Sequence, residues 1–220
     1  MDKELGGVLI TAEQIKRVEL KRLRANNIPF VVINYKDDDA ENCVTIDWAS
    51  GSYEVAKYLI VKGHRRIGYL GGMVETFDVD KQKYAGFTKA LSEAGLTLEP
   101  GLLKQCPYTE RDRVTPLVEE LLELSPRPSA IFCGDDIIAA KVLQTAQKLE
   151  LKVPENLAIV GFGNMPIGTR LFPELTTVDV PRYELGRQAM MMFSGLKATG
   201  NLTSEKPLVL PTHLITRGSS

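Results

Sequence analysis

The stretch Pro128–Pro166, PSAIFCGDDIIAAKVLQTAQKLELKVPENLAIVGFGNMP, predicts a strand, a helix and a second strand in that order. The apolar runs Ala130–Cys133 and Ala158–Phe162 are short and bounded by turn-forming residues, which is typical of buried strands. Between them, Asp135–Leu149 has the length and apolar spacing of a helix. Because a tight hairpin cannot join two strands across such a helix, the strands are expected to run parallel in one sheet.

The same alternation of apolar runs and helical segments extends through the rest of the sequence. Further strands are expected at residues 7–11, 30–33, 44–47, 67–70, 102–108 and 176–180, and 208–216 is expected to form two short strands. Further helices are expected at 12–26, 48–62, 80–94, 110–124 and 183–198. The predicted fold class is therefore α/β, with helices covering both faces of parallel sheets. Ligands bind such sheets beyond the carboxyl ends of the strands, so the residues that follow each strand are the candidates for a site.

The composition excludes several classes of protein. The 220 residues include 27 Lys+Arg and 28 Asp+Glu, a net charge of -1, whereas strongly basic nucleic-acid binders carry a large positive excess. An apolar content of 44% and a charged content of 25% are ordinary for a globular protein. The sequence has no apolar run long enough to span a membrane, and its first ten residues, MDKELGGVLI, lack the pattern of a secretory signal. We therefore expect a cytoplasmic protein with no membrane partner.

The sequence also lacks the residue patterns of common enzymes and metal sites. Its cysteines Cys43, Cys106 and Cys133 are scattered and show no CxxC spacing, which predicts reduced thiols. The glycine-rich segments 68–72 and 161–163 lack the third glycine of a dinucleotide-binding turn, and neither GxxxxGK[ST] nor GxSxG occurs. With only two histidines as well, we expect no catalytic residue, no metal and no cofactor.

Two interpretations are open for Asp135 and Asp136, which follow the first strand of the opening stretch. Adjacent carboxylates at the end of a strand could contact a ligand. Alternatively, Asp135 could cap the next helix while Asp136 lies in its first turn, where the helix dipole favours an acidic residue. The residues alone do not choose between these roles.

Three parts of the sequence together resemble the effector-binding region of LacI-type bacterial transcription regulators. The first is GHRRIGYLGG at 63–72 with KYAGFTKALSEAGL at 83–96, and the second is the opening stretch. The third is FPELTTVDVPRYELGRQAM at 172–190 with LPTHLITRGSS at 210–220. The motifs keep the order of the family and cover essentially the whole chain.

The resemblance implies a periplasmic-binding-protein-like type I fold, with two doubly wound parallel-sheet lobes joined by three crossovers. It places residues 1–63 and 181–198 in an N-terminal lobe and 64–175 and 207–220 in a C-terminal lobe, with crossovers at 176–180 and 199–206. It also predicts that the first strand–helix–strand–helix unit of the N-terminal lobe is missing. The chain is thus expected to be an effector domain truncated at its N-terminus.

The function implied by the resemblance is that of an effector sensor in a repressor. A small molecule such as a sugar or nucleoside would bind between the lobes and control the binding of operator DNA by a helix-turn-helix that this chain lacks. A homodimer is expected, as is the absence of enzymatic activity. The alternative is a periplasmic sugar-binding protein of a transporter, which has the same fold. The missing signal pattern and the string PELTTVDVP favour the regulator.

The resemblance also assigns candidate ligand contacts. Tyr108 stands where the family places an aromatic ring that stacks on a sugar or base, although a tyrosine at a strand end is commonly a half-buried structural residue. Lys83 replaces the usual arginine, so the planar fork that binds ligands through two hydrogen bonds is lost. Asp135 and Asp136 stand where an asparagine or glycine followed by an aspartate is usual.

The other assigned contacts differ more from the family. Gly163 stands where an aspartate is common, so that a carboxylate is lost and Asn164 is its nearest substitute. Phe77 and Val79 replace polar contacts on one wall. Trp48 follows a predicted strand and faces either the ligand or the core.

Overall fold

The computed structural model describes residues 6–11, 17–34, 42–199 and 207–220. The chain divides into two compact units, each made of two segments. The first unit contains residues Met1–Asp47 and Pro181–Pro211, and the second unit contains Trp48–Val180 and Thr212–Ser220. The chain therefore passes between the units three times, after Asp47, after Val180 and after Pro211.

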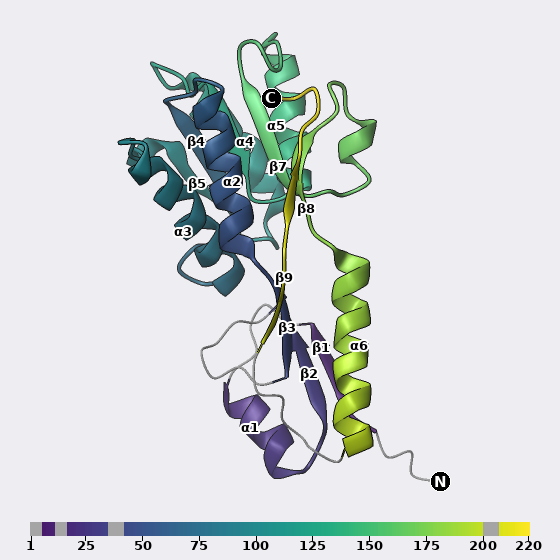
Figure 1. The fold of residues 1–220 in the computed structure, drawn as a ribbon. Coiled ribbons are helices and arrows are strands. Elements are labelled where there is room, and N and C mark those ends of the chain that lie inside the picture. The colour runs from purple at the N-terminus through teal and green to yellow at the C-terminus, as the bar shows by residue number, and fades with distance from the viewer. Residues whose placement is uncertain (1–5, 12–16, 35–41, 200–206) are drawn as a thin grey trace. The chain divides into compact units, whose positions relative to one another are not determined.

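The first unit is built on a four-stranded parallel sheet in the order β1-β2-β3-β9. Its strands are β1 Val8–Thr11, β2 Phe30–Ile33, β3 Cys43–Ile46 and β9 Leu208–Leu210, and its helices are α1 Arg17–Ala25 and α6 Arg182–Thr199. The strands β2 and β3 are buried along their whole length. One reason is that Leu20 of α1 packs on Phe30 and Val32, while α6 runs along β2 and β3 (Figure 1).

The second unit contains a six-stranded sheet in the order β10-β8-β7-β6-β4-β5. The strands are β4 Ile67–Gly71, β5 Leu103–Gln105, β6 Ala130–Cys133, β7 Ala158–Gly163, β8 Thr176–Asp179 and β10 His213–Ile215. Neighbouring strands are parallel except β10, which runs antiparallel to β8. The carboxyl ends of β4 to β8 therefore meet at one border of the sheet, which we call the carboxyl edge.

Helices cover both faces of this sheet (Figure 1). They are α2 Trp48–Val61 and α3 Asp78–Glu93 on one face and α4 Val114–Glu123 and α5 Asp136–Lys148 on the other, with short 3-10 helices η1 Pro100–Leu102, η2 Arg111–Arg113 and η3 Gly168–Arg170 in the connections. Successive strand residues point to opposite faces. Ile131 accordingly packs in the aliphatic core under α4 and α5, whereas Phe132 lies 5.4 Å from the ring centroid of Tyr69 on the other face.

The helices α2 and α3 lie unusually close together because Gly86 has no side chain. A Cβ atom at position 86 would lie 2.0 Å from the carbonyl oxygen of Ala49 in α2. This close contact brings Trp48, the first residue of α2, next to Lys83, which precedes Gly86 by one helical turn. Gly86, which lies in the segment KYAGFTKALSEAGL, is therefore required for the packing of α2 on α3 beside the carboxyl edge.

The α/β class predicted above is confirmed, but the predicted division between the lobes needs correction. The helix α2 belongs to the second unit and not to a lobe that ends at residue 63, because it packs against α3. The strand β9 belongs to the first unit, because it pairs with β3. Residues 176–180 are not a free crossover, since β8 is a strand of the six-stranded sheet, and 200–206 of the third expected crossover lie outside the described residues.

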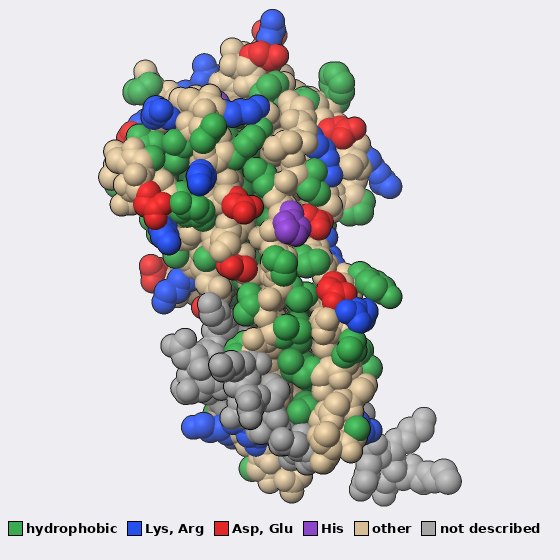
Figure 2. Space-filling view, viewed as in Figure 1, with side chains coloured by type: hydrophobic (Ala, Val, Ile, Leu, Met, Phe, Trp, Pro, Cys, Tyr) green, Lys and Arg blue, Asp and Glu red, His purple; other side chains and the backbone are tan. Residues whose placement is uncertain are grey.

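The surface agrees with the nearly neutral composition. On the face of the second unit that Figure 2 shows, basic and acidic side chains are interspersed and do not form one basic surface. The three cysteines are buried free thiols. Within the described ranges, no helix is both long enough and apolar enough to cross a membrane.

Candidate ligand-binding site

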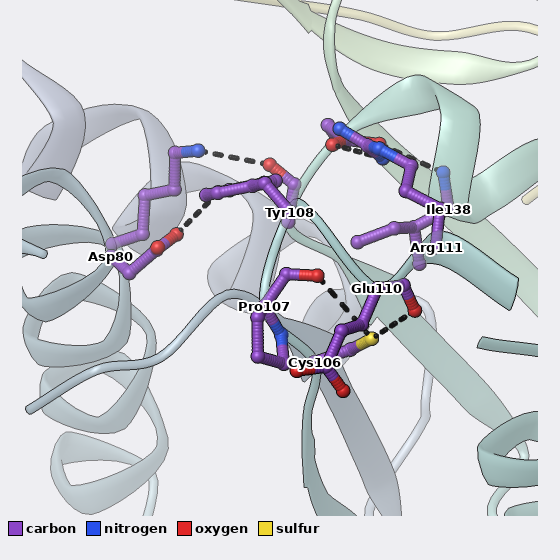
Figure 3. A network of polar contacts seen from close by, with 10 residues as sticks. Asp80, Cys106, Pro107, Tyr108, Glu110, Arg111 and Ile138 are labelled. Atoms are coloured by element: carbon purple, nitrogen blue, oxygen red, sulfur yellow. Dashed lines mark hydrogen bonds and ion pairs between the residues drawn. The ribbon is translucent and has the colours of Figure 1, made fainter. Parts of the chain in front are cut away.

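Polar and aromatic side chains gather at the carboxyl edge of the second unit, where the sequence predicted a site. In Figure 3, Tyr108 lies between Asp80 of α3 and Arg111 of η2. Tyr108 follows β5, and Asp135 follows β6 two strands away in the sheet. Side chains from three separate segments of the sequence therefore meet at one place.

A buried hydrogen bond joins Tyr108 to Asp80. The Tyr108 hydroxyl donates to Asp80 Oδ1 at 2.6 Å, and Asp80 is completely buried. Burial raises the pKa of Asp80, while the charge of Lys83 and the hydrogen bond from Tyr108 partly oppose that rise. Burial and the nearby charge of Asp80 also raise the pKa of the Tyr108 hydroxyl, so it remains a donor. Tyr108 is thus fixed in place through its hydroxyl group.

Lys83 is buried, with 4% of its surface exposed, and lies between a carbonyl group and two aromatic rings. Its Nζ donates to the carbonyl oxygen of Gly134 at 2.9 Å and lies 4.9 Å from the ring centroids of both Trp48 and Phe162. Such cation–π contacts contribute about 0.5–2 kcal/mol each, depending on how far they are desolvated. Trp48 is itself buried and packs on Phe162 with the ring centroids 5.5 Å apart, which agrees with the core-packing interpretation.

Asp135 has two roles at the start of α5. Its Oδ1 accepts a hydrogen bond from the backbone N–H of Ile138 at 2.8 Å, which makes it the N-cap that one interpretation of the sequence predicted. Its carboxylate also forms an ion pair with Arg111, whose Nη1 lies 2.8 Å from Asp135 Oδ2. The Arg111 guanidinium carbon lies 5.3 Å from the Tyr108 ring centroid. The ring centroids of Phe77 and Tyr108 are 6.0 Å apart.

Asp136 does not offer a free carboxylate, so its prediction as a ligand contact needs correction. The residue is completely buried. Its two oxygens accept hydrogen bonds from the backbone N–H of Met165 and from the Thr177 hydroxyl, each at 2.5 Å. Asp136 therefore ties α5 to β8 and to the segment after β7, which is a structural role.

Gly163 and Asn164 form a turn at the end of β7 in which the side chain of Asn164 is already bonded. Gly163 has a φ of +129°, which a residue with a side chain rarely adopts, and Asn164 has a φ of +49°, which asparagine tolerates. Asn164 Nδ2 donates to Asp179 Oδ1 at 2.8 Å, and its Oδ1 accepts from Arg217 Nη2 at 2.8 Å. The other predicted wall residue, Val79, is buried.

The structure thus brings some predicted residues together and separates others. Tyr108 contacts both Phe77 and Arg111, Asp135 pairs with Arg111, and Lys83 contacts Trp48 and the carbonyl group of Gly134. Asp136, Gly163 and Asn164 instead belong to a second group near β8.

The sequence analysis did not single out Asp80, Arg111 and Phe162 as site residues. Asp80 precedes Lys83 by three residues, a spacing that places both on one helix face. Arg111 follows Tyr108 by three residues in the segment after a strand, which was already a place to look.

The chemistry available here is that of binding. The site combines aromatic rings with cationic donors and carboxylate acceptors, which suits a small molecule that carries both polar groups and apolar faces. Across the described ranges, no group of three or more His, Cys, Asp or Glu side chains could hold a metal ion.

Comparison with known proteins now identifies the family. Residues 56–220 match the model of the periplasmic binding protein-like domain. The chain belongs to this family. It is also 30% identical over 219 residues to the HTH-type transcriptional repressor CytR of Escherichia coli K12, an alignment that covers 99% of the chain and 63% of that relative. The chain spans about three-fifths of the length of the curated relatives that it matches.

Two solved structures of transcriptional regulators resemble this periplasmic binding protein-like domain closely. The putative transcriptional regulator LacI from Bacillus cereus subsp. cytotoxis NVH 391-98 has a TM-score of 0.89 and 30% identity over 98% of this chain and 76% of its own. The transcriptional regulator CelR in complex with cellobiose has a TM-score of 0.89 and 25% identity over 100% of this chain and 67% of its own. The resemblance to LacI-type effector-binding domains that the sequence motifs indicated is therefore confirmed.

Proposed function

We propose that this chain is the effector-sensing domain of a LacI-type transcriptional repressor. A small molecule such as a sugar or nucleoside binds at the carboxyl edge of the second unit, and its binding controls the recognition of operator DNA by a helix-turn-helix in the whole protein. The observation that carries the proposal is the meeting of Lys83, Tyr108, Arg111 and Asp135 at this edge. CytR is named as a transcriptional repressor and the two solved structures are named as transcriptional regulators, which favours the regulator over the transport alternative.

The side chains at this edge suit a polyhydroxylated or heterocyclic ligand. Arg111 offers hydrogen-bond donors on its exposed side, and a sugar hydroxyl can accept from them. The rings of Phe77 and Tyr108 lie nearby and provide apolar surface for a sugar or base. The CelR structure, which matches this chain along its full length, contains the disaccharide cellobiose, so a saccharide of that size is a reasonable first ligand.

The proposal assigns a binding role and no enzymatic one. The effector acts by stabilising one state of the protein in preference to another, which requires different affinities for the two states but no bond-breaking step. The close pair His64 and Ser129, 2.9 Å apart between ring nitrogen and hydroxyl, precedes β4 and β6 and so lies at the opposite end of these strands from the site. We further propose that the protein acts in the cytoplasm, where its operator is found, and that it forms a homodimer.

The test is a thermal shift measurement with cellobiose, glucose, galactose, ribose, adenosine and cytidine, together with the acidic compounds galacturonate, glucose 6-phosphate and adenosine monophosphate. A ligand that binds only the folded protein adds about 2.7 kcal/mol of stability at a hundred times its Kd, so at least one compound should raise the Tm in a concentration-dependent way. Tyr108→Ala should remove that rise. Tyr183→Ala is the matched control, because Tyr183 is 85% exposed on α6 in the first unit.

Two results would contradict the proposal. One is that no compound in the panel changes the Tm of the wild-type chain. The other is that Tyr108→Ala, shown to be folded, binds as tightly as the Tyr183→Ala control.

A further inference from the structure

Arg111 is held in a fixed position at the candidate site by two neighbours. Its guanidinium lies over the ring of Tyr108, with 5.3 Å between its central carbon and the ring centroid. Its Nη1 is bound to Asp135, at 3.1 Å from Oδ1 and 2.8 Å from Oδ2. Tyr108 is in turn fixed by its hydrogen bond to Asp80. The guanidinium plane is thus placed by contacts on one face and at one corner.

This arrangement leaves one edge of the guanidinium unused. Within the part of the chain that the structure describes, Arg111 Nε and Nη2 have no hydrogen-bond partner, since both recorded contacts with Asp135 use Nη1. About a third of the side-chain surface of Arg111 is exposed, 35% against 17% for Asp135. The edge formed by Nε and Nη2 presents two parallel N–H donors, the geometry that matches the two oxygens of a carboxylate or phosphate.

Three aspartates at the carboxyl edge already accept hydrogen bonds. Asp135 accepts from both Ile138 and Arg111, Asp80 accepts from Tyr108, and Asp136 accepts from Met165 and Thr177. Asp80 and Asp136 are also completely buried. Asp80 Oδ2 lacks a hydrogen-bond partner in the described part of the chain, but it is buried away from the surface. The exposed polar capacity that remains here is therefore that of the Arg111 donors, and the strongest acceptor for a charged donor is an anion.

We infer that the ligand of this site is an acidic small molecule, whose carboxylate or phosphate group binds the Nε–Nη2 edge of Arg111. The inference rests on the proposed function and makes Arg111 the residue that determines specificity. Lys83 stands where the family usually has an arginine, so the planar guanidinium is lost at that position. Arg111 of η2, which lies over the ring of Tyr108, provides a guanidinium in its place. A sugar acid and a sugar phosphate share this chemistry, and the experiment separates them.

The experiment compares neutral ligands with acidic partners of the same skeleton by thermal shift and isothermal titration calorimetry. The pairs are galactose with galacturonate, glucose with glucose 6-phosphate, and adenosine with adenosine monophosphate. Each ligand is measured on the wild type, on Arg111→Gln and on Arg111→Lys. The matched control is Arg113→Gln, because Arg113 lies in the same short helix, pairs with Glu110 and has 64% of its side chain exposed.

The acidic member of at least one pair is expected to bind the wild type about tenfold or more tightly than its neutral partner, since charge-assisted bonds are roughly twice as strong as neutral ones. Arg111→Gln should abolish this preference, and Arg111→Lys should keep only part of it because lysine has no planar fork. Arg113→Gln should leave it unchanged. A preference for galacturonate identifies a carboxylate, and one for a phosphorylated ligand identifies a phosphate.

The inference and the proposed function fail in different ways. Neutral ligands that bind as tightly as their acidic partners overturn the inference alone, as does an acid preference that survives in Arg111→Gln. If no member of any pair binds the wild type, the proposed function fails and the inference fails with it.

Discussion

The two sides of the carboxyl edge in the second unit contain similar residues but are organised differently. On the β7–β8 side, Asp136 accepts from the Thr177 hydroxyl and the Met165 backbone, and Asn164 accepts from Arg217 while it donates to Asp179. On the β5–β6 side, Asp80 and Asp135 also accept hydrogen bonds, yet Nε and Nη2 of Arg111 have no partner in the described ranges. The polar groups of the first side therefore hold α5 to β8 and to the segment after β7, whereas the second side has donors left for a ligand.

The difference is clearest for Asp135 and Asp136, which are adjacent in sequence. Asp135 precedes the helix and caps it, so its carboxylate stays near the surface and can hold Arg111. Asp136 is the first helical residue, and its side chain turns under the sheet edge toward Thr177. The N-cap residue Asp135 therefore belongs to the candidate site, whereas the next residue, Asp136, belongs to the core.

Removing the buried carboxylate on the β7–β8 side should have the largest effect on stability. Asp136→Ala leaves the partly buried Met165 N–H and the buried Thr177 hydroxyl without their acceptor, so the free energy of unfolding should fall by about 3 kcal/mol. Urea denaturation followed by circular dichroism measures the change. Asp112→Ala, which removes an exposed carboxylate from η2, is the control. An equal decrease in the free energy of unfolding of the two variants would show that the hydrogen bonds of Asp136 do not stabilise the fold.

A smaller loss is expected when the scaffold of the β5–β6 side is disturbed. Gly86→Ala places a methyl group against the backbone of Ala49, which should force α2 and α3 apart at a cost of about 1–3 kcal/mol. The same shift separates Trp48 from Lys83, so ligand binding should weaken as well. Gly101→Ala is the control, because a Cβ at position 101 has no neighbour within 4 Å. A wild-type Tm in Gly86→Ala would contradict the assigned packing.

The smallest effect is a change in how stability depends on pH. Because burial raises the pKa of Asp80 above its ordinary value of 3.8, the folded protein binds this proton more tightly than the unfolded chain does. The resulting stability is fully present below pH 3.8 and is lost as the pH rises through the raised pKa. The wild type should therefore lose stability relative to Asp80→Asn over that range, as urea denaturation at a series of pH values would show.

The control for this comparison is Asp78→Asn. It removes a carboxylate from the same turn of α3, where Asp78 accepts a hydrogen bond from Gln82 at 2.6 Å and has no recorded contact with Tyr108. Parallel pH curves for the wild type and Asp80→Asn would contradict the prediction.

The sequence predicted most of the fold because its signals are local. The strand Ala130–Cys133 and the helix that begins at Trp48 were expected at the positions where they occur, since short apolar runs and helical spacing depend on neighbouring residues. The boundary between the units was placed at residue 63 and lies at Asp47, because it depends on the contact of α2 with α3. The residue pattern of α2 by itself does not indicate which of the two sheets the helix packs against.

The candidate site was predictable only in part, for the same reason. The position of Tyr108 and Asp135 after strands, together with the family resemblance, pointed to the edge of the sheet where their side chains come near Arg111. The burial of Asp136 could not be foreseen, since it depends on Thr177, which lies 41 residues away in sequence. Arg111 was missed because its role follows from the ring beneath it and the carboxylate beside it, and neither contact has a sequence signature.

The contact between Lys83 and Trp48 has a practical consequence. Trp48 is the only tryptophan of the chain, and its ring centroid lies 4.9 Å from the Lys83 ammonium group. A positive charge at that distance perturbs the excited state of an indole, so the emission of this single fluorophore depends on where Lys83 lies. Any ligand that draws Lys83 away changes the intensity without an attached dye. The protein therefore contains its own optical probe beside the candidate site, suited to rapid-mixing measurements of how quickly an effector arrives and leaves.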